Sequence, residues 1–136
     1  MTQPSNIMII DEDLEDTEIF CDALHEIDET IECTQMKDGI KALKLLMADP
    51  VKPDFIFVDL NMTVINGRKW LSQLKKINIL KHIPVIIYSG SRSPLDVEKA
   101  RENGASFYFP KPVRISELKK LLSAVFANKQ KSFYVV

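Results

Sequence analysis

Cysteine, tryptophan, glycine and long apolar runs are scarce in this chain of 136 residues, which has two cysteines, one tryptophan and four glycines. Cys21 and Cys33 do not form the spacing of a metal site. No run approaches the roughly 20 apolar residues that span a bilayer, and the N-terminus lacks the basic start and apolar stretch of a secretory signal. We therefore expect one cytoplasmic domain without a membrane segment, in which both cysteines are free thiols packed in the interior.

Basic residues are absent from the first part of the chain. Residues 1–36 contain eleven Asp or Glu and no Lys or Arg, although the formal net charge of the whole chain is only -1. Such acidity is usually a solvated helix face, but here it begins at the end of an apolar segment, where repulsion between carboxylates favours a bound cation. The basic residues elsewhere are scattered, which argues against direct binding to nucleic acid.

Apolar segments alternate with segments of helical periodicity along the whole chain. Short apolar runs predict strands at 6–10, 31–36, 55–58, 83–88 and 107–109. Apolar residues at helical spacing predict helices over 14–27, 40–47, 70–77 and 118–125, and Ser93, Pro94 and Asp96 carry the signals of a helix start that Asn103 and Gly104 end. Five strands alternating with five helices predict a doubly wound α/β fold with a parallel sheet.

Polar side chains stand at the carboxyl ends of four predicted strands. Asp11 and Glu12 follow the first strand, Asp59 the third and Ser89 the fourth, and Lys111 comes just after the fifth. In a doubly wound sheet these ends meet at one edge, where ligands bind. Clustered carboxylates need a hard cation such as Mg²⁺, and a carboxylate beside a metal, an ammonium and a hydroxyl can accept a phosphoryl group.

Four motifs in this order resemble the receiver domains of two-component response regulators, and the resemblance covers nearly the whole chain. They are Ile-Ile-Asp-Glu-Asp at 9–13, Asp-Leu-Asn-Met-Thr-Val-Ile-Asn-Gly at 59–67, Ile-Pro-Val-Ile-Ile-Tyr-Ser-Gly at 83–90 and Gly-Ala-Ser-Phe-Tyr-Phe-Pro-Lys-Pro at 104–112. The resemblance implies a flavodoxin-like fold with strand order 2-1-3-4-5. It also implies that Asp59 is the phosphoacceptor, and that Mg²⁺ is bound by Glu12, Asp59 and the main-chain carbonyl of Asn61, with Asp11 acting through a water.

The same resemblance assigns the residues that respond to phosphorylation. Ser89 would bond the phosphoryl group after transfer, and Lys111 would bridge to its oxygens. Tyr108 matches the aromatic residue of the family that turns inward as the hydroxyl moves. A cis peptide bond between Lys111 and Pro112 is also implied, which would aim the lysine into the site.

Several positions depart from the commonest family pattern. Glu12 replaces a more frequent aspartate, so its longer side chain must adopt another rotamer to reach a metal. Thr63 stands where proline is usual, which predicts a less restrained loop after Asp59. Gly90 replaces a common alanine, and Pro110 lacks the backbone donor that would extend the fifth strand, so this strand is expected to end early.

Alternative functions with the same fold or chemistry are less consistent with the residues. A haloacid-dehalogenase-type phosphohydrolase needs a second carboxylate at the position of Asn61, and an amide cannot act as the general acid. A flavodoxin-type FMN carrier would place phosphate where Asp11, Glu12 and Asp13 would repel it. A receiver that acts only as an interaction module, without phosphorylation, remains an alternative.

We therefore expect a phosphoacceptor switch rather than an enzyme with an output activity. A sensor histidine kinase or a histidine phosphotransfer protein would donate to Asp59, and the α4-β5-α5 surface of the family would then change its binding to a downstream protein. We expect the receiver domain to span 1–128, followed by a tail at 129–136 and no output domain. The apolar residues at 133–136 are expected to be frayed, packed back on the domain, or part of a homodimer contact. The 81–84 stretch and the position of Asp16 are similar to single-domain receivers served by photoreceptor-type kinases.

Overall fold

A computed structural model describes residues 4–63, 65–129 and 132–135, so Val64 of the second motif and residues 130, 131 and 136 of the expected tail lie outside the described residues. The five strands form one parallel sheet in the order β2-β1-β3-β4-β5, as predicted. The strands are β1 (Asn6–Ile10), β2 (Glu32–Met36), β3 (Phe55–Val58), β4 (Val85–Ser89) and β5 (Phe107–Pro110). Pro110 is therefore the last residue of β5, and the expected early end of this strand is wrong.

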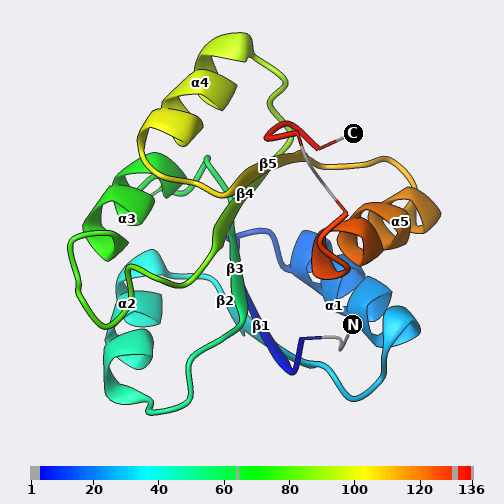
Figure 1. Ribbon diagram of the computed structural model, residues 1–136, viewed down its shortest axis with the longest axis horizontal. Helices are drawn as coiled ribbons and strands as arrows, with labels where there is room; N and C mark the ends of the chain where they lie inside the picture. The colour runs from blue at the N-terminus through cyan, green and yellow to red at the C-terminus, as the bar shows by residue number, and fades with distance from the viewer. Residues whose placement is uncertain (1–3, 64, 130–131, 136) are drawn as a thin grey trace.

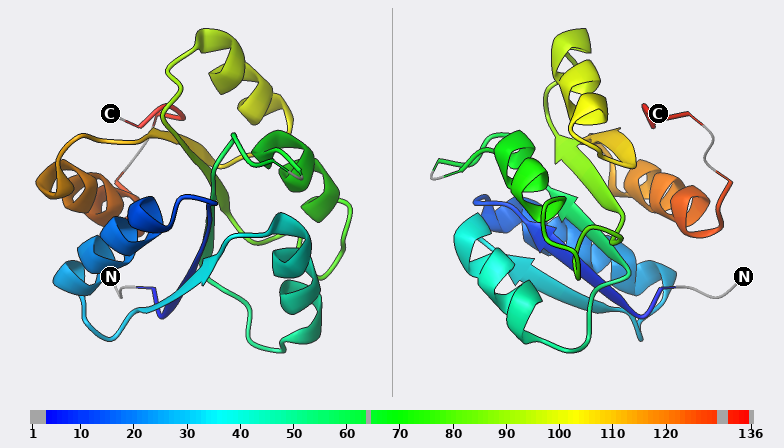
Figure 2. Two further views of the ribbon diagram at one scale, coloured as in Figure 1. Left: turned by 180° about the vertical axis from the view of Figure 1, so that it is seen from behind. Right: turned by 60° about the vertical axis from the view of Figure 1, so that its left-hand side comes forward.

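Five helices cover the two faces of the sheet (Figures 1 and 2). They are α1 (Leu14–Ile27), α2 (Gly39–Ala48), α3 (Gly67–Leu74), α4 (Pro94–Glu102) and α5 (Ile115–Phe126). Figure 1 shows α1 and α5 on one side of the sheet and α2, α3 and α4 on the other. In the described part of the chain, no helix combines the length and the apolar character that a membrane crossing needs.

Alternating strand side chains build one apolar core on each face of the sheet. Ile7 and Ile9 of β1 belong to the core under α1 and α5, whereas Met8 and Ile10 belong to the core under α2, α3 and α4. Because every central strand is covered on both faces, the strands are apolar without polar alternation. Trp70 lies fully buried in the second core, and its indole N–H donates to the Gly39 carbonyl oxygen over 2.8 Å.

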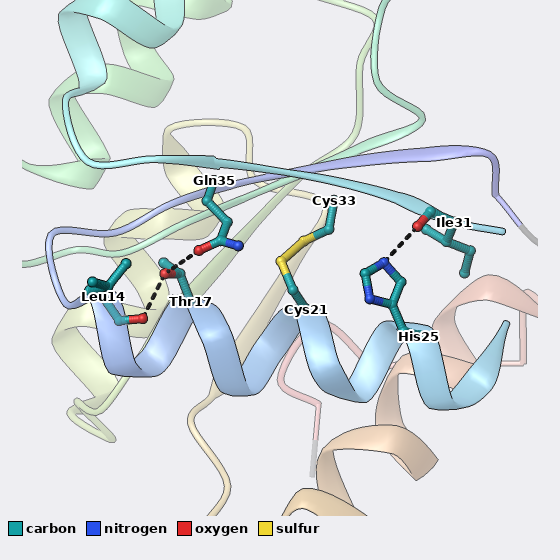
Figure 3. The surroundings of a disulfide bond; sticks show 7 residues. All are labelled: Leu14, Thr17, Cys21, His25, Ile31, Cys33 and Gln35. Carbon is teal, nitrogen blue, oxygen red and sulfur yellow. Dashed lines mark hydrogen bonds between the residues drawn. A yellow bond between two sulfur atoms is a disulfide. The ribbon is translucent and has the colours of Figure 1, made fainter. Parts of the chain in front are cut away.

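Cys21 and Cys33 form a disulfide with a Cα–Cα distance of 5.8 Å, so the expectation of two free thiols is wrong. Their spacing in sequence gave no signal, because the bond depends on how α1 packs across β2. Positions 17, 21 and 25 share one face of α1, and positions 35 and 33 share one face of β2, with position 31 directly before this strand. Figure 3 shows the three pairs side by side along the two elements.

The contacts on either side of the disulfide are hydrogen bonds between α1 and the β2 region. The Thr17 hydroxyl lies 2.9 Å from Oε1 of Gln35, and Nε2 of His25 lies 3.0 Å from the carbonyl oxygen of Ile31 (Figure 3). Three successive turns of α1 are therefore fastened to the edge of the sheet. The first of these turns also carries the acidic residues Glu15 and Asp16.

The C-terminal residues 132–135 pack back against β5. The Tyr108 N–H donates to the Phe133 carbonyl oxygen, and the Val135 N–H donates to the Tyr108 carbonyl oxygen, each over 2.9 Å. The Tyr134 ring stacks on the Tyr108 ring with centroids 5.9 Å apart, and Val135 is fully buried. Of the three expected arrangements of these residues, the structure therefore has the packed-back one.

Candidate functional site

The register of the sheet brings two acidic residues to the same edge. Ile10 pairs with Val58, so the next residues, Asp11 and Asp59, leave neighbouring strands side by side. The Asp59 N–H donates to the Ile10 carbonyl oxygen over 3.0 Å, which continues the ladder to this point. Asp11 and Asp59 are only 2% and 8% exposed, so their carboxylates are largely withdrawn from water.

The ammonium of Lys111 lies between these carboxylates and a third one. Its Nζ is 2.8 Å from Oδ2 of Asp11, 2.7 Å from Oδ2 of Asp16 and 3.8 Å from Oδ1 of Asp59. The lysine reaches this position because the chain after Pro110 continues to pair with β4: the Lys111 N–H donates to the Ser89 carbonyl oxygen over 2.8 Å. One cation is thus shared by three carboxylates.

Burial and charge change the proton affinity of the central groups. Burial raises the pKa of Asp59, the Lys111 ammonium opposes this shift, and the charge of Asp11 adds to it, with a net increase above the ordinary value. Burial also disfavours the charged form of Lys111. The hydrogen bonds to Asp11 and Asp16 outweigh this effect and raise the pKa of the lysine, so it stays an ammonium at neutral pH.

The loop after β3 holds Asp59 in place. The main-chain N–H groups of Leu60 and Asn61 donate to the Asp59 carboxylate and act to lower its pKa. Gly67 then passes so close to Asp59 that a Cβ atom at this glycine would lie 2.3 Å from the Asp59 carbonyl oxygen. The turn that starts α3 therefore requires glycine, and this close approach fixes the backbone under the carboxylate.

Glu12 does not join the other carboxylates. Its Oε2 accepts the Thr63 main-chain N–H over 2.8 Å and also accepts the Thr63 hydroxyl. These two hydrogen bonds lower the pKa of Glu12. Thr63 replaces the usual proline and provides an N–H that a proline lacks, so the loop is tethered at this residue rather than loosened as expected.

The residues expected to hold Mg²⁺ are only partly together. Within residues 4–63, 65–129 and 132–135, no three His, Cys, Asp or Glu side chains gather as a group that could hold a metal ion. The expected cluster of three carboxylates does not form, because Thr63 holds Glu12 at one side. Asp11 and Asp59 remain a fitting donor pair, since Mg²⁺ commonly binds one or two carboxylates and keeps several waters.

Ser89 and Tyr108 form a second group beside the carboxylates. Both are fully buried, and a hydrogen bond between their side chains acts to lower the pKa of Tyr108, against a larger opposite effect of burial. The Ser91 N–H donates to Oγ of Ser89 over 3.1 Å, and the Tyr108 hydroxyl donates to the Ser91 carbonyl oxygen over 2.8 Å. The loop after β4 thus links the hydroxyl at the site to the edge strand.

The expected cis bond between Lys111 and Pro112 is wrong, because the described residues contain no cis peptide bond. The lysine enters the site without it. Pairing of the main chain with β4 directs the Lys111 side chain across the edge of the sheet. Nζ lies 5.4 Å from the centroid of the Tyr88 ring and contacts Asp11 and Asp16.

Asp16 belongs to the site although no role was predicted for it from its own chemistry. It lies in the first turn of α1, where its N–H donates to Oδ1 of the capping residue Asp13 over 3.2 Å. A signal was present in the sequence: Asp16 precedes the buried Phe20 by one helical turn, which places a carboxylate on the stripe of α1 that faces the sheet.

Comparisons with known proteins agree with the motifs. A family model described as a response regulator receiver domain matches residues 7–123. The chain is 30% identical over 122 residues to the two-component response regulator ORR11 of Oryza sativa, which covers 90% of this chain and 81% of that protein. It is 28% identical over 112 residues to the polar-differentiation response regulator DivK of Brucella anthropi, which covers 82% of this chain and 88% of DivK.

Solved structures show the same fold. The phosphorylated cyanobacterial phytochrome response regulator RcpA superposes with a TM-score of 0.82 at 24% sequence identity, over 93% of this chain and 96% of that one. The chemotaxis response regulator CheY4 of Vibrio cholerae superposes with a TM-score of 0.76 at 22% identity, over 89% of this chain and 98% of CheY4.

Proposed function

Because the chain belongs to the response regulator receiver domain family, we propose that it is a signalling switch in which Asp59 accepts a phosphoryl group. The donor is a phosphohistidine on a sensor histidine kinase or a histidine phosphotransfer protein. The observation that carries this proposal is the position of Asp59, a buried carboxylate at the end of a central strand with the Lys111 ammonium 3.8 Å away. We also propose a cytoplasmic location, a compartment whose reducing conditions act against the bond between Cys21 and Cys33.

The transfer step requires an ionised acceptor and compensation for phosphoryl charge. A carboxylate oxygen of Asp59 forms the new bond to phosphorus while the bond from phosphorus to the donor nitrogen breaks, and the electron pair of that bond stays on the imidazole. The N–H groups of Leu60 and Asn61 orient the acceptor carboxylate. Lys111 is charged at neutral pH and offers its ammonium to the phosphoryl oxygens.

Mg²⁺ would be held by Asp59, by the main-chain carbonyl of Asn61, and by Asp11 through a water, with Glu12 as a further ligand. When bound, the ion neutralises negative charge on the acceptor and on the phosphoryl oxygens. Support comes from the buried acidic pair and from a neighbour in fold, the response regulator Rcp1, whose structure is described as a Mn²⁺-bound form. Glu12 can contribute only after it leaves Thr63.

The signal leaves through Ser89 and Tyr108. When the Ser89 hydroxyl turns to the phosphoryl group, it exchanges its bonds to Ser91 and Tyr108 for the new one. Such a modification shifts the population between two conformers when it bonds better in one of them. A downstream protein reads this shift on the surface of α4, β5 and α5. Residues 132–135 lie on the β5 part of that surface, so a partner binds against this segment or displaces it.

The chain acts as a phosphoryl acceptor that promotes its own phosphorylation by small donors and loses the group slowly to water. Incubation with acetyl phosphate and Mg²⁺ followed by intact mass measurement tests the proposal. We expect the mass of one added phosphoryl group in the wild type and in Asp54→Asn, and none in Asp59→Asn. Asp54 is a matched control because it precedes β3, at the opposite end of the strand that Asp59 follows, and its carboxylate accepts the main-chain N–H groups of Ser5 and Asn6 there. Labelling of Asp59→Asn would refute Asp59 as the acceptor.

One observation favours a second candidate, an interaction module that works without phosphorylation. Thr63 holds Glu12 away from Asp11 and Asp59, and Lys111 already provides a positive charge beside both. If this candidate is correct, beryllofluoride and Mg²⁺ will leave the tryptophan and tyrosine fluorescence unchanged, and a phosphohistidine donor will not label the chain.

A further inference from the structure

The ammonium of Lys111 is hydrogen-bonded to two carboxylates, and neither is the proposed acceptor. Nζ lies 2.7 Å from Asp16 and 2.8 Å from Asp11, but 3.8 Å from Asp59, which is beyond hydrogen-bond distance. An ammonium has three donors. Two of them are used by carboxylates that lie away from the position a phosphoryl group on Asp59 would take.

Asp16 differs from Asp11 as a partner of Lys111. Asp11 is also a proposed metal ligand, so its interaction with the lysine changes whenever Mg²⁺ binds, whereas Asp16 has no such role. Nζ lies 3.8 Å from Asp59, so it must move to reach phosphoryl oxygens there, and of its two hydrogen bonds the one to Asp16 can lengthen without disturbing a proposed metal ligand. We propose that Asp16 is a positioning residue that holds Lys111 in the unphosphorylated state and competes with the phosphoryl group for its ammonium. This proposal rests on the phosphoacceptor function.

The surroundings of Asp16 suit a partner that can be exchanged. The carboxylate stands at the N-terminus of α1, where the helix dipole stabilises its negative charge. Its side chain is 35% exposed, against 2% for Asp11. A cavity of about 80 Å³ between α1 and the loop after β5 is lined by Asp16, Tyr88 and Lys111 among others. Water can therefore solvate the carboxylate when the ammonium leaves.

The consequence is a bias against the phosphorylated state. Asp16 stabilises the position of Lys111 in the unphosphorylated domain and not in the phosphorylated one. The population of the phosphorylated conformer is therefore lowered by the free energy of this interaction. Removing the charge of Asp16 releases the ammonium to the phosphoryl oxygens. The domain then retains a phosphoryl group, or an analogue of it, more strongly and for longer.

Beryllofluoride binding in the presence of Mg²⁺ measures this bias in the full chain. We expect Asp16→Asn to bind beryllofluoride about three- to tenfold more tightly than the wild type, the range for one partly exposed charge pair. Glu15→Gln is the matched control, because it removes one exposed negative charge from the same turn of α1. We expect this control to change the affinity by less than about twofold. Asp16→Glu keeps a carboxylate within reach of Lys111 and should restore the wild-type affinity.

Two further readouts separate this role from a general effect of charge or folding. The NMR signal of the Lys111 side chain should shift in Asp16→Asn without beryllofluoride and stay unchanged in Glu15→Gln. Mg²⁺ affinity is measured for each variant by calorimetry, and beryllofluoride binding is compared at saturating Mg²⁺, because the released ammonium lies beside the proposed metal ligands Asp11 and Asp59. If Asp16→Asn fails to fold, the test uses Asp16→Glu and the wild type. The NMR signal of the Lys111 side chain is then followed during a titration with beryllofluoride, and it must shift as the analogue binds.

Equal or weaker beryllofluoride binding in Asp16→Asn than in Glu15→Gln would overturn the inference while leaving the phosphoacceptor function intact. A wild type that binds no beryllofluoride and takes no label from acetyl phosphate would instead refute the function itself, and the role of Asp16 with it.

Discussion

We predict that reduction of the disulfide between Cys21 and Cys33 lowers the free energy of unfolding by an amount that the structure allows us to calculate. The disulfide closes a short loop from the middle of α1 to β2, with a sequence separation of 12 residues. Reducing this bond leaves the packing of the sulfur atoms in place but removes the constraint on the unfolded chain. The perturbation therefore tests the crosslink itself, without the loss of side-chain volume that a substitution would add.

The magnitude follows from the entropy of closing the loop. For a separation of 12 residues, the chain-entropy relation gives a stabilisation of about 3 kcal/mol at 25 °C. For a chain of 136 residues, this corresponds to a decrease of roughly 10 °C in the midpoint of thermal unfolding on reduction. Such a loss is a large share of the 5–15 kcal/mol that typical domains have.

Urea unfolding of the oxidised and the reduced protein measures this difference. We expect the reduced wild type to lose about 3 kcal/mol and to show a larger dependence on urea, because its unfolded chain exposes more surface. Cys21→Ala combined with Cys33→Ala should lose at least as much, since it also removes packing around the nearly buried Cys21. Coincident unfolding curves with and without reductant, or two alkylated thiols in the protein before reduction, would refute the reasoning.

Three further substitutions test the site, and Gly90→Ala serves as a control. Asp59→Asn without divalent metal should stabilise the protein at pH 7 by about 1 kcal/mol, because a buried carboxylate is removed. The stabilisation should fade as the pH drops from the raised pKa of Asp59 toward the ordinary value of 3.8, because the wild-type carboxyl becomes neutral in the folded protein over this range. A stabilisation that stays constant down to pH 3.8 would contradict the raised pKa of Asp59. Gly67→Ala should destabilise the protein by roughly 1–3 kcal/mol in urea unfolding, whereas Gly90→Ala, whose added Cβ meets nothing within 4 Å, should have little effect. Thr63→Ala should tighten Mg²⁺ binding in calorimetry, because Glu12 loses one of its two donors; unchanged or weaker binding would argue against Glu12 as a ligand.

The alternation of strands and helices and the meeting of Asp11, Asp59 and Lys111 could be predicted from sequence because each depends on local patterns, whereas the order of the strands was implied by the resemblance to the receiver family. Apolar runs mark the strands, and the parallel arrangement brings all carboxyl ends to one edge. Ile10 pairs with Val58, so the two aspartates at that edge follow from the register. The family motifs then identify which strand ends carry chemistry.

The disulfide and the ion pair of Asp16 with Lys111 were not predicted in this way, because both depend on where side chains of α1 point across the sheet. A spacing of 12 residues between two cysteines has no meaning until α1 is laid on β2 with positions 21 and 33 opposite each other. The position of Glu12 depends on Thr63, whose N–H becomes significant only once the two loops are adjacent.

The central claim is that Asp59 takes a phosphoryl group at a site supported by Mg²⁺. The most direct measurement is transfer from a radiolabelled phosphohistidine donor, with and without EDTA, to the wild type, to Asp59→Asn and to Asp54→Asn. The account predicts label on the wild type and on Asp54→Asn only when Mg²⁺ is present, and none on Asp59→Asn. Label on Asp59→Asn, or transfer that is equally fast in EDTA, would contradict it.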